Sequence, residues 1–195
     1  MGLRSTAEEW GWVTRTLHWF VALAVFGMIA AGLYAKSRDV STVAGDLSYF
    51  RVIDVHKSLG LLIILLMAFR ALWRLSERTP RAPAGLPAWE VVLARLTQLL
   101  LYVGLFLIPV SGFLWATAYG EPVRFFGLKL PGLMHLRGAE ATLARHVHVL
   151  AAFALIAVVT LHFTGALKNH FVGRNDVLHK MLGLAPQERA VLKNE

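Results

Sequence analysis

Four long apolar segments constrain what this chain can fold into more than any other feature of its sequence. A helix that crosses a bilayer needs about 20 predominantly apolar residues. Segments of this kind cover about residues 13–35, 55–75, 91–118 and 143–167. Within lipid, backbone polar groups must be hydrogen-bonded inside the structure, which favours helices for such spans. We therefore expect an all-α, integral membrane four-helix bundle, with residues 1–195 forming a single membrane domain.

The composition agrees with this expectation. Charged residues make up 16% of the chain and hydrophobic residues 56%, whereas soluble domains contain about 25% Asp, Glu, Lys and Arg. The chain has no cysteine. Its absence excludes thiolate-bound metals, iron–sulfur clusters and covalent attachment of haem through cysteine.

The formal net charge of +8 is interpreted as membrane topology and not as nucleic-acid binding, because Lys and Arg accumulate in cytoplasmic connections. Four spans place both termini on one side of the membrane. That side holds 12 of the 20 Lys and Arg residues, including a cluster between Arg70 and Arg81. The bias predicts that both termini are cytoplasmic. Arg70 and Arg95 lie near span ends, and long cationic side chains can reach the lipid headgroups from such positions.

Five histidines lie inside the spans, where ionisable side chains are costly and usually functional. His18 lies in the first span and His56 in the second. His148 and His162 both lie in the fourth span, 14 residues apart. On a helix this separation is about 40° short of four full turns and a rise of about 21 Å, so both side chains leave one face at two depths. His146 points about 160° away from the His148 direction.

The direction of each span predicts how these histidines pair. The first span starts, and the fourth ends, on the cytoplasmic side, so His18 and His162 share the inner depth. The second and fourth spans both start on the outer side, so His56 and His148 share the outer depth. Neutral imidazole is a common axial ligand of haem iron, and two imidazoles leave no open position on it. The pattern favours two stacked haems that transfer electrons over a haem that binds oxygen.

Basic residues beside these histidines are candidates for binding the anionic haem propionates. Lys57 directly follows His56. Arg15 lies about one turn before His18, and Arg145 about one turn before His148. Interfacial anchoring is at least as good an interpretation of any one of these cations.

Other roles for the histidines stay open. A single histidine in a span can be a proton relay, a helix–helix hydrogen bond or a satisfied buried group. A transition-metal site would need ligands clustered at one depth, often with a carboxylate, and the spans contain almost no Asp or Glu. The remaining histidines are expected to have surface or interfacial roles: His135, His146, His170 and His179.

The motifs resemble those of the bacterial cytochrome b561 family, the four-helix dihaem cytochromes of the inner membrane. The resemblance covers about residues 10–183. Its most specific part is the spacing of the histidines. The motifs are Leu17-His18-Trp19, His56-Lys57-Ser58-Leu59-Gly60, Ser111-Gly112-Phe113, His148, and the run from Leu161 to Phe171 that contains His162.

The resemblance implies two b-type haems with iron bound by His18, His56, His148 and His162. It also implies electron exchange with the membrane quinone pool, with ubiquinone as substrate or bound acceptor. Members of the family commonly have two adjacent histidines before the Phe that ends the fourth span, and here the first of them is Asn169. An asparagine can hydrogen-bond a quinone carbonyl but cannot act as an acid or base, so a proton step would fall to His170.

The leading interpretation is an electron carrier in the lipid of the bacterial inner (plasma) membrane, between a periplasmic donor and quinone. The donor would be a small anion such as superoxide or an acidic redox protein, because positive potential on the outer surface attracts anions. Whether the chain is an oxidoreductase of the superoxide:ubiquinone type or only a carrier stays open. The alternatives are a cytochrome b subunit of a hydrogenase or dehydrogenase complex, without turnover of its own, and a haem-free transporter or scaffold.

Overall fold

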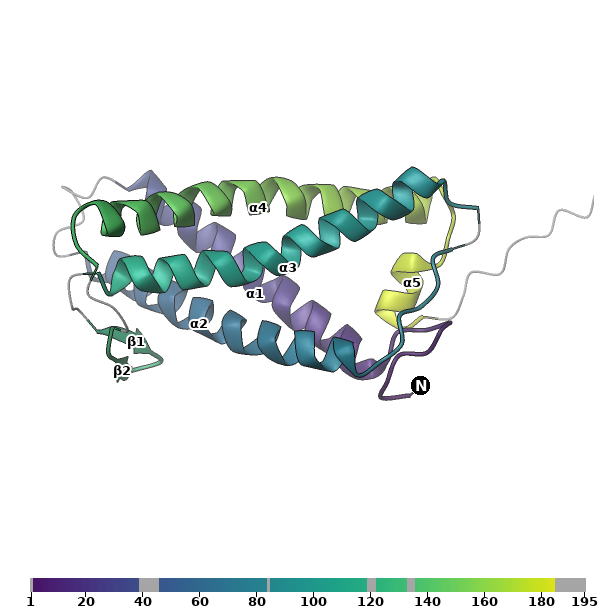
Figure 1. The fold of residues 1–195 in the computed structure, drawn as a ribbon, viewed down its shortest axis with the longest axis horizontal. Helices are drawn as coiled ribbons and strands as arrows, with labels where there is room; N and C mark the ends of the chain where they lie inside the picture. Colours follow the sequence, from purple (N-terminus) through teal and green to yellow (C-terminus); the bar gives the residue numbers. More distant parts are fainter. Residues whose placement is uncertain (1, 39–45, 84, 119–121, 133–135, 185–195) are drawn as a thin grey trace, which may run out of the picture.

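A computed structural model of the chain describes residues 2–38, 46–83, 85–118, 122–132 and 136–184. Within these residues it contains four long helices, a short hairpin and a short helix (Figure 1). Each long helix is long and apolar enough to cross a membrane, which confirms the predicted four-helix membrane bundle. The elements are α1 (Trp12–Ser37), α2 (Leu47–Leu75), α3 (Ala88–Ala116), β1 (Val123–Phe125), β2 (Leu128–Leu130), α4 (Ala139–Phe171) and α5 (Val177–Leu182).

Helices α2 and α4 extend well beyond the apolar segments that predict them. Helix α2 begins at Leu47 instead of near residue 55, because Asp46 caps it. The Asp46 carboxylate accepts hydrogen bonds from the backbone N–H groups of Ser48, at 2.9 Å, and Tyr49, at 3.2 Å. Such a cap satisfies N–H groups that have no partner inside the helix. Apolar composition marks the part of a helix that lies in lipid, whereas caps set where the helix ends.

The helices pack most closely as three neighbouring pairs: α3 with α4, α1 with α2, and α2 with α3. Helix α4 makes few close backbone approaches to α1 or α2, so the space on that side is bridged by side chains. Large apolar side chains cover the outer faces; Leu23 is 73% exposed and Leu150 is 74% exposed. These faces are where lipid contacts the bundle. The small buried core consists of Val21, Val25, Ile63, Met67, Leu105, Ile108 and Leu155.

One end of the bundle, called here the N-terminal end, gathers the N-terminal segment, the α2–α3 connection and α5 (Figure 1). The backbone N–H of Arg81 donates to the Ala7 carbonyl at 2.9 Å. The Trp19 indole Nε1 on α1 donates to the Met181 carbonyl on α5 at 3.1 Å. The described parts nearest the two termini therefore lie together, as an even number of crossings requires.

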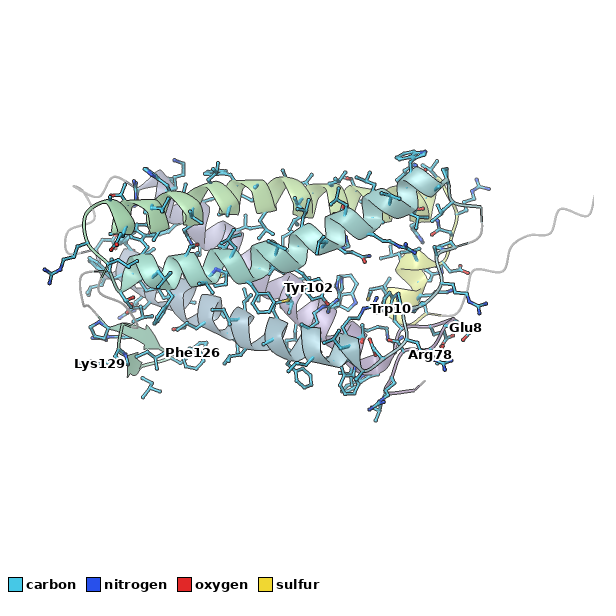
Figure 2. All side chains as sticks on the ribbon, viewed as in Figure 1. Glu8, Trp10, Arg78, Tyr102, Phe126 and Lys129 are labelled. Carbon is cyan, nitrogen blue, oxygen red and sulfur yellow. The ribbon has the colours of Figure 1, made fainter. Side chains whose placement is uncertain are left out.

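The opposite end, called here the hairpin end, carries the two strands, and Figure 2 shows Lys129 there, far from Glu8. Strands β1 and β2 are antiparallel, with Val123 opposite Leu130. The buried Ser58 hydroxyl on α2 joins the hairpin to the bundle. It donates to the Arg124 carbonyl at 3.0 Å and accepts from the Phe126 N–H at 3.0 Å.

Candidate functional site

Two pairs of histidines face each other inside the bundle, one towards each end. His18 on α1 and His162 on α4 have ring centroids 6.1 Å apart. His56 on α2 and His148 on α4 have ring centroids 6.3 Å apart. Both pairs join α4 to helices that it otherwise approaches little. These are the two pairs that the directions of the spans place at shared depths.

The centroid distances fit imidazoles that bind opposite sides of one metal atom. Metal–imidazole bonds are about 2.0–2.1 Å long, and with the ring centroid about 1.1 Å beyond the nitrogen, two opposed ligands have centroids about 6.3 Å apart. A direct hydrogen bond between two imidazoles would bring their centroids to about 5.1 Å. The observed 6.1 and 6.3 Å therefore match opposed metal ligation and exceed the distance for direct hydrogen bonding.

His148 is held in a defined orientation. Its Nδ1 lies 2.8 Å from the Ile108 carbonyl on α3, which makes Nδ1 the donor and leaves the lone pair of Nε2 available to a metal. The Trp115 ring lies 5.9 Å from the imidazole. At Gly112, an added Cβ would lie 2.7 Å from both Nδ1 and Cε1 of His148. A side chain on α3 at position 112 would therefore displace the imidazole.

His56, on the other side of this pair, lies against Gly32 of α1 at ordinary van der Waals distance. An added Cβ on Gly32 of α1 would lie 3.6 Å from His56 Cε1, so the ring packs against a helix surface without a side chain. Within the described part of the chain, the buried His56 Nδ1 has no hydrogen-bond partner. A buried polar atom without a partner is costly, which fits a site that a further group completes.

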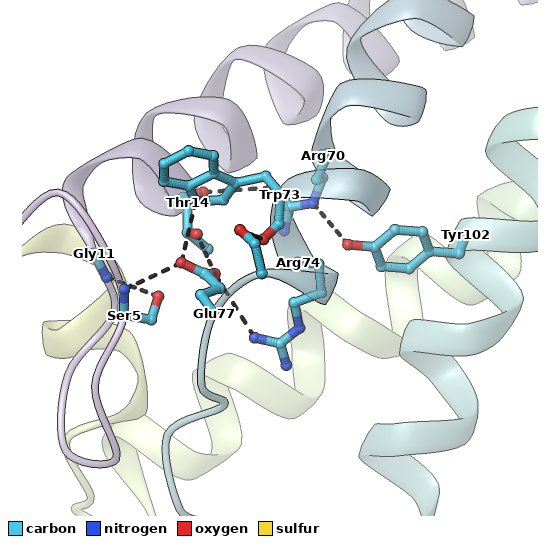
Figure 3. Close-up of polar contacts among 9 residues, drawn as sticks. Ser5, Gly11, Thr14, Arg70, Trp73, Arg74, Glu77 and Tyr102 are labelled. Carbon is cyan, nitrogen blue, oxygen red and sulfur yellow. Dashed lines mark hydrogen bonds and ion pairs between the residues drawn. The ribbon is translucent and has the colours of Figure 1, made fainter.

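The pair at the N-terminal end has an aromatic and a cationic neighbour. The Trp19 ring stands edge-on to His18, with centroids 5.1 Å apart. Arg70 on α2 interacts electrostatically with both His18 and His162. Its Nε donates to the Tyr102 hydroxyl at 3.3 Å (Figure 3). These contacts direct the Arg70 side chain between the helices.

The three predicted propionate ligands lie in different surroundings. Lys57 is half-buried and interacts electrostatically with His56. Arg145 is exposed, and its guanidinium lies 5.8 Å from the Trp115 ring centroid. Arg15 is buried, and its guanidinium contacts the position of Gly183 at the end of α5. Lys57 and Arg145 thus lie near the histidine pair at the hairpin end, whereas Arg15 packs against α5.

Asn169 and His170 lie where α4 ends. The Asn169 amide donates to the Gly165 carbonyl at 3.0 Å and accepts from the Asn175 amide at 2.7 Å. Asn169 also lines a cavity of about 220 Å³. The His170 ring lies 5.0 Å from that of His179 on α5, and the Nδ1 atoms of both are buried with no partner in the residues the structure describes.

Two further histidines, His146 and His135, were also predicted to be peripheral. His146 is exposed on α4, and His135 lies outside the described residues. Sequence reasoning missed the contact between His170 and His179, because the turn that follows α4 decides it. In the ranges that the structure covers, no group of three or more His, Cys, Asp or Glu side chains could hold a metal ion. The candidate ligands inside the bundle occur as pairs at two depths.

Comparison with known proteins agrees with this geometry. A sequence profile described as prokaryotic cytochrome b561 matches residues 9–184. The chain is 32% identical to cytochrome b561 homolog 2 of Escherichia coli (strain K12), over 98% of the chain and 100% of that protein. It is 22% identical to cytochrome b561 homolog 1 of the same strain, over 85% of the chain and 92% of that protein. A further match, at 27% identity over 66% of the chain and 73% of the relative, is the probable superoxide oxidase CybB of Yersinia pestis.

These matches agree with four apolar helices, of which α1, α2 and α4 carry the paired histidines. Membership implies that the chain binds b-type haem, contacts lipid on its outer faces and carries electrons in the bacterial inner membrane, which it crosses several times. The chain belongs to the prokaryotic cytochrome b561 family.

Proposed function

We propose that this protein carries electrons from a donor on the periplasmic side to quinone through two b-type haems. His56 and His148 would hold one haem, called here the outer haem, and His18 and His162 the other, called the inner haem. The observation that carries the proposal is that both pairs have the separation of opposed metal ligands, 6.3 and 6.1 Å, with one partner of each on α4.

The ligand set determines the kind of chemistry. When bound, b-type haem supplies reversible one-electron oxidation and reduction. Two imidazoles on each iron leave no position for oxygen, which limits the site to electron transfer. The Ile108 carbonyl fixes the tautomer of His148, and Gly112 leaves room for its ring. The protein's contribution is thus to hold the four imidazoles rigidly at two depths.

The orientation in the membrane follows from charge. We place the N-terminal end in the cytoplasm. Arginines are frequent in the connection between α2 and α3 and at the helix ends beside it, and cytoplasmic connections carry an excess of Lys and Arg. The hairpin end, with Lys57 and Arg145 near His56 and His148, then faces the periplasm. The outer haem would receive electrons there, and the inner haem would pass them on near α5.

Superoxide is the donor that we favour. Its negative charge suits a surface that carries Lys57, Lys129 and Arg145, since positive potential accelerates the approach of a small anion. The name of the Yersinia pestis relative, probable superoxide oxidase, supports this choice. In the complete reaction two superoxide anions each lose one electron and leave as dioxygen. One quinone gains both electrons together with two protons and becomes quinol.

Quinone would react at the N-terminal end, where α4 ends. Asn169 lines the cavity of about 220 Å³ there. To contact a quinone carbonyl, its amide would have to exchange one of its present partners, Gly165 or Asn175. An asparagine cannot supply protons. His170, in contact with His179, has an imidazole that can deliver a proton from the cytoplasmic side.

The test is rapid-mixing spectroscopy of the purified protein in detergent or nanodiscs. We expect superoxide to reduce the haem within the mixing experiment and ubiquinone to reoxidise it, with catalytic loss of superoxide when both are present. Reduction by quinol without any reduction by superoxide would contradict the proposed donor. A preparation that reacts with neither, but co-purifies with a peripheral redox subunit, would instead indicate a cytochrome b subunit of a larger complex.

A further inference from the structure

Arg70 places a positive charge inside the bundle, beside the histidine pair at the N-terminal end. The residue lies on α2, and its side chain reaches the two neighbouring helices. Nε donates to the Tyr102 hydroxyl on α3 at 3.3 Å, and Nη1 donates to the Thr14 carbonyl on α1 at 3.4 Å (Figure 3). Both bonds are long for N–H···O contacts. They orient the guanidinium without neutralising it.

No carboxylate in the described ranges forms an ion pair with Arg70; the ion pairs found there join other residues. Glu77, which is drawn in the same close-up, is already bound by other groups (Figure 3). Its carboxylate accepts from the Thr14 hydroxyl at 2.5 Å and from the Trp73 indole at 3.1 Å. It also pairs with Arg74 at 4.0 Å. The charge of Arg70 is thus not balanced by this carboxylate.

A guanidinium within a membrane span is costly unless it is paired. Arg70 has five N–H donors, and its two protein acceptors are neutral groups. Its acceptor Thr14 lies about one helical turn before His18 on α1, which places the guanidinium at the end of the bundle where His18 and His162 face each other. Arg70 also interacts electrostatically with both rings. An anion that belongs there would complete its hydrogen bonding and balance its charge.

We propose that Arg70 is a positioning residue for the inner haem: its guanidinium, oriented by Tyr102 and Thr14, binds a propionate of that haem and raises its reduction potential. The inference rests on the proposed function, since it requires a haem between His18 and His162. A guanidinium binds a carboxylate through strong charge-assisted hydrogen bonds. A nearby positive charge also stabilises the reduced haem, which carries one more electron than the oxidised form.

The consequence is a direction for electron flow. With Arg70 in place, the inner haem holds an electron more strongly than it would without this charge, which favours movement of electrons from the hairpin end towards the N-terminal end. Arg15, the cation predicted from sequence as the propionate ligand on this side, packs against α5 instead. Arg70 therefore takes over a role that sequence spacing assigned to Arg15.

The experiment is a redox titration of the purified protein, monitored by haem absorbance, with haem content measured on the same samples. Arg70→Gln should lower the reduction potential of the inner haem relative to that of the outer haem. The expected change is at least about tenfold in the equilibrium between the two haems, which is about 59 mV for a one-electron couple. Arg70→Lys keeps the charge and should shift it less. Tyr102→Phe removes one contact that orients the guanidinium and should also produce a smaller shift in the same direction.

Arg74→Gln is the matched control, because Arg74 lies one turn along the same helix and is already paired with Glu77. It should leave both potentials close to those of the unmodified protein. If Arg70→Gln retains two haems with unchanged potentials, or if Arg74→Gln shifts them equally, the role of Arg70 is refuted. If Arg70→Gln loses the inner haem, Tyr102→Phe decides, and an unshifted inner potential in that variant overturns the proposal.

The proposed function fails in a different way. Fewer than two haems in the unmodified protein would contradict the two-haem account before any variant is compared. Two haems in that protein, together with unmoved potentials in the Arg70 variants, would contradict only the role of Arg70.

Discussion

At the scale of single residues, each histidine of the candidate site depends on what stands next to it. His148 needs the Ile108 carbonyl to set its tautomer and the bare backbone of Gly112 to make room for its ring. His18 packs against the Trp19 ring. The glycine on a neighbouring helix and the aromatic ring next in the chain are therefore as much part of the site as the imidazoles.

Gly112→Ala tests this dependence. An added Cβ would lie 2.7 Å from the His148 ring, and overpacking of this kind costs about 1–3 kcal/mol. We expect the variant to lose outer haem, measured as the ratio of haem to protein, and to unfold at a lower temperature. Gly104→Ala on the same helix is the control, because its Cβ would meet the methyl groups of Leu155 at 3.0 Å and Ile108 at 4.0 Å, which can move. Full outer haem in Gly112→Ala would refute the steric argument.

Lys57→Ala tests electrostatic attraction of the donor. Steering by a charged surface changes encounter rates by factors of 10–10³, so the loss of one charge near His56 should slow reduction by superoxide about threefold to tenfold. Reduction by a neutral quinol should change little. Stopped-flow rates at low and high salt measure both, and the effect should shrink as salt increases. Arg95→Ala, which removes an exposed cation on α3, is the control. If Lys57→Ala slowed reduction by superoxide and by quinol equally, electrostatic attraction of the donor would be contradicted.

Sequence predicted the histidines better than the cations around them. The separation of His148 and His162 on one helix face follows from helix geometry alone. An arginine near the end of a span can reach either lipid or the bundle interior, because its side chain is long. Contacts from two other helices turn Arg70 inward, and no pattern within its own helix records those contacts. The sequence shows only that Arg70 lies one helical turn deeper in the span than Arg74.

At the scale of elements, the apolar segments predicted where helices lie but not where they end. Asp46 extends α2 to Leu47, and capping of this kind lies outside the apolar window. The hairpin had no sequence prediction. Its turn uses Phe126 and Gly127, with φ of 47° and 95°, and tight hairpins of this type need positive φ at both positions. Phe is an unusual residue for a positive φ, so the signal was weak.

The N-terminal segment is tied to the bundle by one buried carboxylate. Glu77, just beyond α2, accepts hydrogen bonds from the Ser5 N–H at 3.1 Å, the Thr14 hydroxyl at 2.5 Å and the Trp73 indole at 3.1 Å. Burial raises the pKa of Glu77, but the hydrogen bonds from Thr14, Ser5 and Trp73 together outweigh it and hold the pKa below the ordinary 4.5. The ionised form of Glu77 therefore stabilises the folded protein.

Glu77→Gln should lower the free energy of unfolding at pH 7 by about 1–3 kcal/mol, because buried donors lose their charged acceptor. The pKa of Glu77 is lower in the folded protein than its ordinary value of 4.5. The stabilisation is therefore complete at pH values above 4.5 and is lost as the pH falls through the pKa of Glu77 in the folded protein. The difference in stability between Glu77→Gln and the unmodified protein should disappear below pH 4.5. Thermal unfolding measured across a range of pH tests this. Glu8→Gln, an exposed carboxylate in the same segment, is the control. A gap that is constant with pH would contradict this account.

At the scale of the whole molecule, the four crossings and the charge at the two ends give the protein a direction. The N-terminal segment, the α2–α3 connection and α5 share one end, and the hairpin lies at the other (Figure 1). Electrons would enter beside the hairpin and leave where α4 ends. This direction depends on which end faces the cytoplasm, and that orientation is a proposal from the distribution of Lys and Arg.

Labelling of single cysteines tests the orientation, because the chain has none of its own. Lys129→Cys on the hairpin should react with a membrane-impermeant maleimide in intact spheroplasts. Arg78→Cys, in the α2–α3 connection, should react only after the membrane is permeabilised. The unmodified chain is the control for background labelling. The reverse pattern would place the termini in the periplasm and invert the proposed path.

The central claim is that two haems are held by two histidine pairs that share α4, and the haem content of histidine variants tests it most directly. We predict two haems per chain in the unmodified protein, one in His148→Ala, one in His18→Ala, and none in the double variant. His146→Ala, an exposed histidine on the same helix, should keep both haems. Two haems in His148→Ala, with the reduced-state spectrum of the unmodified protein, would contradict the account.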